Sequence, residues 1–153
     1  MLSLEKFQQW SQKQEWNQTT IQVVSDIRVA PPTRRIRSRS GNVSGRYPSR
    51  KMGVTIQFES HKLELAGIYQ MEYDSDVLEY YDQPPSIKLN YKSLNGRNVG
   101  VWHTPDFFVI RQKEAGWEEW KTVKELSQLA VKMPGVGECV MLHAIAGIVL
   151  NFR

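Results

Sequence analysis

Three residues near the middle of the sequence have the types and spacing that metal-dependent phosphodiester hydrolysis requires. Asp106 follows a proline and opens the apolar run 107–110, while Glu119 and Lys121 flank a single tryptophan. Because residues two apart in a strand face the same way, we expect Glu119 and Lys121 to point together. Carboxylates bind hard divalent cations, and a lysine beside them can orient or deprotonate the attacking water or stabilise charge on the phosphate.

A third carboxylate is expected from a helix. Ser60 is a residue type that caps helix N-termini, and a helix is expected from His61 to about Glu72. Helical spacing places Ile68 and Met71 on the same stripe as Glu64. A glutamate that extends an apolar stripe points toward the protein body, so Glu64 can reach the same metal site.

The segments that position these residues alternate between helical and strand patterns. Helices are also expected over 3–15 and 125–133, and strands over 54–58, 77–81, 87–91, 99–110 and 117–123. Asn95-Gly96 is a strong hairpin signal. A second turn at 113–116 folds the strand of Glu119 back beside the strand that begins at Asp106. The pattern predicts an α/β domain with an antiparallel hairpin core covered by helices.

A basic segment precedes this core. From Arg28 to Lys51 the sequence has seven arginines and one lysine but no acid, and proline, glycine and serine break any regular pattern. We expect an extended arm that contacts DNA phosphates. The residues assigned to these contacts are Arg34, Arg35, Arg37, Arg39, Arg46, Arg50 and Lys51. The expected organisation is an N-terminal helical or extended segment (1–27), the basic arm (28–53), a carboxylate-bearing core (54–133) and an atypical tail (134–153).

Composition limits the class of protein without selecting a function. The chain has 153 residues, a net charge of +4, 41% hydrophobic and 24% charged residues, which suits one soluble globular domain. The single cysteine, Cys139, excludes an internal disulfide, and no secretory signal or membrane-spanning stretch is visible, so we expect a cytoplasmic protein. His61, His103 and His143 lack zinc-type spacing and are interpreted as structural or as non-specific polar contacts.

Several segments together resemble the N-terminal catalytic domain of TnsA, the endonuclease subunit of a heteromeric cut-and-paste DNA transposase. They include His103-Thr-Pro-Asp-Phe-Phe-Val109 and Glu118-Glu-Trp-Lys121, and the resemblance covers roughly residues 28–133. It implies a restriction-endonuclease-like PD-(D/E)xK core with a mixed sheet flanked by helices. It also implies that Glu64, Asp106 and Glu119 bind Mg²⁺, for which Mn²⁺ substitutes, and that Lys121 is the active-site lysine.

The resemblance further implies a place in transposition. Members of the family cleave one strand at each transposon end, and a TnsB-like transposase cuts and joins the other strand. A TnsC-like ATPase regulates the complex, and isolated members are expected to be poorly active. We therefore expect this chain to act on double-stranded DNA at transposon ends together with such partners.

The tail departs from the family pattern after Met133, and no charged residue lies between Glu138 and Arg153. Two explanations stay open. The core is truncated or frame-shifted, which we favour, or residues 140–149 supply a last apolar element that covers the sheet. A truncated core would expose a strand edge and apolar surface. The competing functions are another nuclease on the same fold, a non-catalytic DNA-binding or assembly module that has lost turnover, and a purely structural protein.

Overall fold

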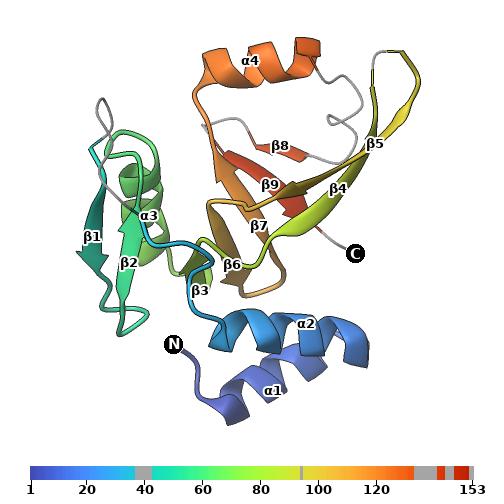
Figure 1. Ribbon diagram of the computed structural model, residues 1–153. Helices are drawn as coiled ribbons and strands as arrows, with labels where there is room; N and C mark the ends of the chain where they lie inside the picture. Colours follow the sequence, from blue (N-terminus) through green and yellow to red (C-terminus); the bar gives the residue numbers. More distant parts are fainter. Residues whose placement is uncertain (37–42, 94, 133–140, 144–146, 152–153) are drawn as a thin grey trace.

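A five-stranded sheet with the strand order β3-β6-β7-β9-β8 lies at the centre of the computed structural model, which describes residues 1–36, 43–93, 95–132, 141–143 and 147–151 (Figure 1). Its strands are β3 (Val77–Asp82), β6 (Phe107–Arg111), β7 (Ala115–Trp120), β8 (Met141–His143) and β9 (Gly147–Asn151). Two further antiparallel pairs stand outside this sheet: β1 (Gly45–Pro48) with β2 (Thr55–Phe58), and β4 (Ile87–Lys92) with β5 (Asn98–His103).

The helices of the described residues are α1 (Leu4–Lys13), α2 (Gln18–Val29), α3 (Glu64–Tyr73) and α4 (Val123–Lys132). Ser3 caps α1 by accepting a hydrogen bond from the Lys6 N–H, and Asn17 caps α2 by accepting one from the Thr20 N–H. None of these helices is both long and apolar enough to cross a membrane.

Strand β6 separates two hydrophobic cores because its side chains alternate between the two faces of the sheet. Phe108 and Ile110 pack with residues of α1 and α2 on one face. Phe107 and Val109 pack with residues of β2 and α3 on the other face. An apolar strand with no polar face fits a sheet that is covered on both sides. Figure 1 shows these layers, with α1 and α2 on one side and α3 beside β1 and β2 on the other.

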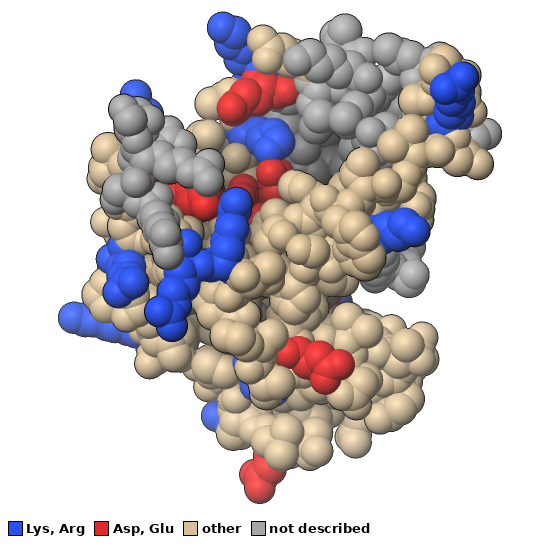
Figure 2. Space-filling model, viewed as in Figure 1, with Lys and Arg blue, Asp and Glu red and all other residues tan. Residues whose placement is uncertain are grey.

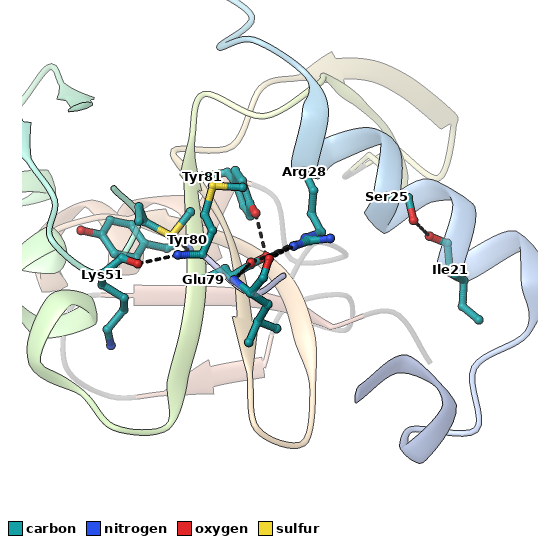
Figure 3. A network of polar contacts seen from close by, with 10 residues as sticks. Ile21, Ser25, Arg28, Lys51, Glu79, Tyr80 and Tyr81 are labelled. Atoms are coloured by element: carbon teal, nitrogen blue, oxygen red, sulfur yellow. Dashed lines mark hydrogen bonds and ion pairs between the residues drawn. The ribbon is translucent and has the colours of Figure 1, made fainter. Parts of the chain in front are cut away.

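A buried ion pair fastens α2 to β3. Glu79 is 0% exposed and accepts hydrogen bonds from Arg28 Nε at 2.8 Å and Arg28 Nη2 at 3.0 Å (Figure 3). The Tyr81 hydroxyl donates to the same carboxylate at 2.7 Å. A buried charge of this kind is tolerated only when it is paired and hydrogen-bonded.

The sheet differs from its prediction in two ways. Strands β4 and β5 do not join the central sheet, since they pair only with each other among the described strands. The expected mixed sheet is also wrong for the described residues, because every neighbouring pair in the central sheet is antiparallel. The result is an α/β arrangement with antiparallel sheets, which is compatible with an endonuclease-like fold.

The tail and two helix boundaries also differ from expectation. Strand β9 pairs with β7 and β8 pairs with β9, so these tail residues extend the sheet at its edge instead of covering its face. Helix α3 begins three residues later than expected, at Glu64, because the preceding residues form a turn in which Ser60 Oγ accepts from the Leu63 N–H. Helix α4 begins at Val123, while its expected end at Met133 lies outside the described residues.

Candidate active site

The β6–β7 hairpin brings Asp106 and Glu119 together. In its register Phe107 lies opposite Glu118, so one further step along the antiparallel ladder places Asp106 opposite Glu119. Residues directly opposite each other point to the same face of the sheet. The Trp120 N–H donates to Asp106 Oδ2 at 2.8 Å, which ties the start of β6 to the end of β7.

The backbone of Asp106 is held from β3 as well. The Gln83 N–H donates to the Asp106 carbonyl oxygen at 3.0 Å. Gln83 is 1% exposed and has a φ of 47°, a left-handed conformation that non-glycine residues adopt only when their surroundings impose it. The side-chain oxygen of Gln83 accepts a hydrogen bond from Arg34 Nε at 2.7 Å, so both the backbone and the side chain of Gln83 are hydrogen-bonded.

Glu119 is held at both of its carboxylate oxygens. Lys121 Nζ donates to Oε1 at 2.5 Å, and His103 Nε2 lies 3.0 Å from Oε2. Burial by itself raises the pKa of Glu119, but the hydrogen bonds from His103 and Lys121 outweigh it, and the pKa falls below its usual value. For Lys121, burial lowers the pKa, but the hydrogen bond and charge of Glu119 prevail and the pKa rises. The two residues therefore form a charged pair at neutral pH.

Asp106 is perturbed in the opposite direction. Burial, reinforced by the negative charges of Glu119 and Glu64, raises its pKa from 3.8 to about 7. The Trp120 N–H and the charge of Lys121 oppose this shift without cancelling it. Asp106 thus gains or loses its proton near neutral pH. Perturbed carboxylates of this kind gather at functional sites.

Glu64 is the first residue of α3, and its charge acts on Asp106. It is 7% exposed, and its Oε2 accepts a hydrogen bond from the Glu59 N–H at 2.8 Å. Burial raises its pKa, and the charges of Glu59 and Glu119 act in the same direction. Ile68 and Met71 are buried on the same stripe, as the helical spacing predicts. Figure 2 shows acidic side chains gathered between α3 and β7, with basic side chains beside them.

Strand β7 has two adjacent glutamates, whose side chains point to opposite faces of the sheet. Glu118 lies opposite Phe107 and is 3% exposed. It forms an ion pair with Arg111, and burial raises its pKa. Glu119 faces the other way, toward His103 and Lys121. Only the second glutamate therefore belongs to the cluster with Asp106.

Residues 74–138 match the family model described as TnsA-like endonuclease N terminal. This segment is therefore similar to the N-terminal domain of TnsA-like endonucleases. The matched segment includes Asp106, Glu119 and Lys121, while Glu64 lies before it. A search of curated proteins found no match. The resemblance read from the sequence is thus confirmed over the segment that contains the β6–β7 hairpin.

The carboxylates of this site suit a divalent cation. Mg²⁺ prefers carboxylate oxygens and keeps several waters. Glu64 Oε1 and Asp106 Oδ1 accept no hydrogen bond from any described residue, so each acid has an oxygen left for a ligand. Within the described ranges, however, no three carboxylate, histidine or cysteine side chains form a complete metal-binding group. The carboxylates raise one another's pKa, and a cation between them would relieve that repulsion.

His103 is the site residue that the sequence interpretation missed. It ends β5, three positions before Asp106, and its imidazole contacts Glu119. The sequence signal was its place in the His-Thr-Pro-Asp run of the TnsA-like segment. Histidine spacing alone could not reveal it, because His103 meets a carboxylate sixteen positions away and not another histidine.

The basic segment, residues 28–53, is partly folded where the structure describes it. Strand β1 pairs with β2, and Arg35 and Arg46 line a groove of about 520 Å³ together with Pro31, Pro32, Thr55 and Gln57. Arg34 forms an ion pair with Glu59 at 3.2 Å, and the Arg50 side chain is exposed. Figure 2 shows basic side chains gathered below the acidic cluster. Arg37 and Arg39 lie outside the described residues.

Lys51 departs from its expected role as a phosphate contact. Its Nζ donates to the carbonyl oxygens of Met71 at 2.7 Å, Asp74 at 2.6 Å and Val77 at 2.8 Å. A lysine ammonium has three donors, so all of them are used within the protein. Lys51 therefore joins the end of α3 to the start of β3, which is a structural role.

Proposed function

We propose that this chain is a metal-dependent DNA endonuclease that cleaves DNA strands at transposon ends during transposition. The family match supports a nuclease of a transposase system. The observation that carries the proposal is the pairing of two acids with opposite properties at the end of one hairpin. Asp106 has a pKa of about 7, while Glu119 is kept ionised by Lys121. Separated carboxylate pKa values of this kind are typical of acid–base and metal-assisted chemistry.

Glu64, Asp106 and Glu119 are the residues that would hold Mg²⁺ or Mn²⁺. When bound, the cation supplies an activated water and neutralises charge on the phosphate. Lys121 holds Glu119 in place and brings a positive charge to the site, where it stabilises a phosphate that gains negative charge. The Trp120 N–H fixes the orientation of Asp106. Each of these contacts is present before substrate binds, so little reorganisation is required.

The proposed substrate and partners follow from the family and from the charge of the chain. Double-stranded DNA is the substrate, and Arg34, Arg35, Arg46 and Arg50 supply phosphate contacts, with Arg37 and Arg39 beside them in the sequence. TnsB-like and TnsC-like proteins are the proposed partners. They would supply cleavage and joining of the other strand and regulation of the complex.

Two observations favour a second candidate, a non-catalytic DNA-binding or assembly module. Both oxygens of Glu119 are engaged by side chains, and the described residues contain no complete metal-binding group. Such a module would bind DNA in a salt-dependent way without cleaving it.

Calorimetric titration of Mg²⁺ into the full chain separates the two candidates. The endonuclease proposal expects saturable binding that disappears in Asp106→Ala and is retained in Asp76→Ala, a control that removes an exposed acid from a turn. Plasmids carrying transposon ends, incubated with partner proteins, should then be nicked by the parent but not by Asp106→Ala. A folded parent chain that binds no Mg²⁺ would favour the non-catalytic module.

A further inference from the structure

The β4–β5 hairpin has two chemically different faces. The inner-face residues Ile87 and Leu89 are partly buried against the core formed by α1, α2 and β6. The residues between and beyond them, Lys88 and Asn90, are exposed. Because side chains alternate along a strand, Lys88 and Asn90 share the outer face of the ribbon. The hairpin is therefore anchored by one face and leaves the other open.

The outer face carries basic, amide and aromatic side chains, which are types that proteins use to contact nucleic acids. In the register, Lys88 lies opposite Trp102 and Asn90 opposite Gly100, and Trp102 is 74% exposed. Gly100 leaves room for the side chains of Asn90 and Lys88, because a Cβ at Gly100 would lie 3.0 Å from Asn90 Oδ1 and 3.1 Å from Lys88 Cε. Arg97 is exposed at the tip. The sequence has no acidic residue from Ile87 to Thr104, so the ribbon presents only positive charge.

The base of the ribbon is joined directly to the catalytic cluster. Ser86 and Thr104 are hydrogen-bonded at 2.6 Å across the base of the hairpin. His103, the last residue of β5, contacts Glu119, and Asp106 follows three positions later. Figure 2 shows basic side chains over β4 and β5 on the same face of the molecule as the acidic cluster. A polyanion lying on the ribbon would therefore extend toward the carboxylates.

We infer that the outer face of the β4–β5 ribbon binds duplex DNA in its major groove. The major groove is about 12 Å wide and admits a two-stranded ribbon. Six residues in a strand span about 20 Å, enough to follow the groove past several base pairs. Lys88 and Arg97 would contact phosphates, and Asn90 and Asn98 would face base edges, for which asparagine is a suitable partner. The choice of DNA as occupant rests on the proposed nuclease function. The ribbon has basic residues and no acidic ones, which favours DNA over a protein partner.

The test measures binding of the full chain to a fluorescein-labelled 30-base-pair duplex in EDTA, where no cleavage occurs. The double variant Lys88→Ala/Arg97→Ala is compared with Lys13→Ala/Lys113→Ala, which removes the same charge from exposed sites on α1 and the β6–β7 turn. We expect about 10-fold weaker binding for the ribbon variant, and a slope of log K against log salt that is shallower by about 1.8. The control should bind like the parent, and both variants should keep the parental circular dichroism.

A second measurement locates the groove. Methylation of guanine N7, an atom in the major groove, should weaken binding of the parent chain. An unchanged salt slope in the ribbon variant, or indifference to N7 methylation, would overturn the inference. Normal DNA binding combined with lost transposition would assign the ribbon to a protein partner and would also overturn it. These outcomes are independent of the nuclease proposal, since the latter fails only if Asp106→Ala still nicks DNA or the folded parent binds no Mg²⁺.

Discussion

Lys121 Nζ lies 2.5 Å from Glu119 Oε1, although β7 ends at Trp120 and Lys121 follows the strand. The side-chain alternation of a strand thus continues one residue beyond its last ladder position. The pair stays ionised because each member shifts the pKa of the other toward its charged form. In an acid-x-Lys motif this contact fixes the lysine beside the carboxylates before any substrate arrives.

Replacing this lysine is expected to abolish cleavage without preventing binding. Lys121→Ala removes the positive charge from the site and releases Glu119, so nicking of transposon-end DNA should fall by about 100-fold or more. Lys124→Ala removes an exposed lysine from α4 and serves as the matched control. Nicking rates and fluorescence anisotropy on the same duplex make the comparison. A Lys121→Ala chain that cleaves at the parental rate would exclude this lysine from the active site.

Asp106 is expected to reduce the stability of the folded chain at neutral pH. Its pKa is raised in the folded state to about 7 from 3.8, so folding favours the protonated form. The stability that this protonated side chain contributes is fully present below pH 3.8 and is lost as the pH rises to 7. Asp106→Asn keeps a neutral side chain that accepts from Trp120. In EDTA at pH 8 it should stabilise the chain by about 2 kcal/mol, and less as the pH approaches 4.

Urea unfolding of parent and Asp106→Asn across this pH range measures the difference. Asp76→Asn, at an exposed turn, is the control and should change stability little at any pH. A variant that is less stable than the parent at pH 8 would contradict the pKa assignment. A gain in stability together with a loss of cleavage is the usual trade-off between stability and activity at an active site.

The packing of α3 against Trp120 links a glycine to the site. A Cβ on Gly67 would lie 2.6 Å from Trp120 Cε2, closer than packed atoms approach, so Gly67→Ala must displace the indole. The backbone N–H of Trp120 donates a hydrogen bond to Asp106, so a displacement of Trp120 should reach the carboxylate cluster. We expect Gly67→Ala to destabilise the chain by about 2 kcal/mol and to reduce nicking.

Helix propensity alone predicts that Gly67→Ala stabilises the chain, so the measured change in stability distinguishes the two effects. Alanine in place of glycine inside a helix stabilises by about 1 kcal/mol when nothing obstructs it. A gain in stability for Gly67→Ala would therefore show that Trp120 does not press on α3. If the contact is real, Gly67→Ala/Trp120→Phe should recover part of the loss in a double-mutant cycle.

Local patterns predicted the hairpin of the site but not its surroundings. The turn signal and strand alternation placed Asp106, Glu119 and Lys121 together because these features depend on neighbours in the sequence. The left-handed φ of 76° at Gly96 likewise fits the predicted Asn-Gly turn.

The missed features depend on contacts between distant segments. His103 reaches Glu119 only through the path of β5 past β7, and Lys51 finds its acceptors twenty or more positions away. The departure of β4 and β5 from the sheet is also decided by tertiary packing, since their alternation suits either a sheet or a free ribbon.

Removing one partner of the buried Arg28–Glu79 pair is expected to cost more stability than removing one partner of an exposed pair. Glu79 is 0% exposed, so Arg28→Ala would leave an unpaired buried carboxylate and should cost about 3–5 kcal/mol in urea unfolding. The Arg34–Glu59 pair is 51% and 37% exposed and provides the contrast, since solvent screens it. Glu59→Gln should change stability by less than about 1 kcal/mol. Equal effects of the two substitutions would show that α2 is not held to β3 through this carboxylate.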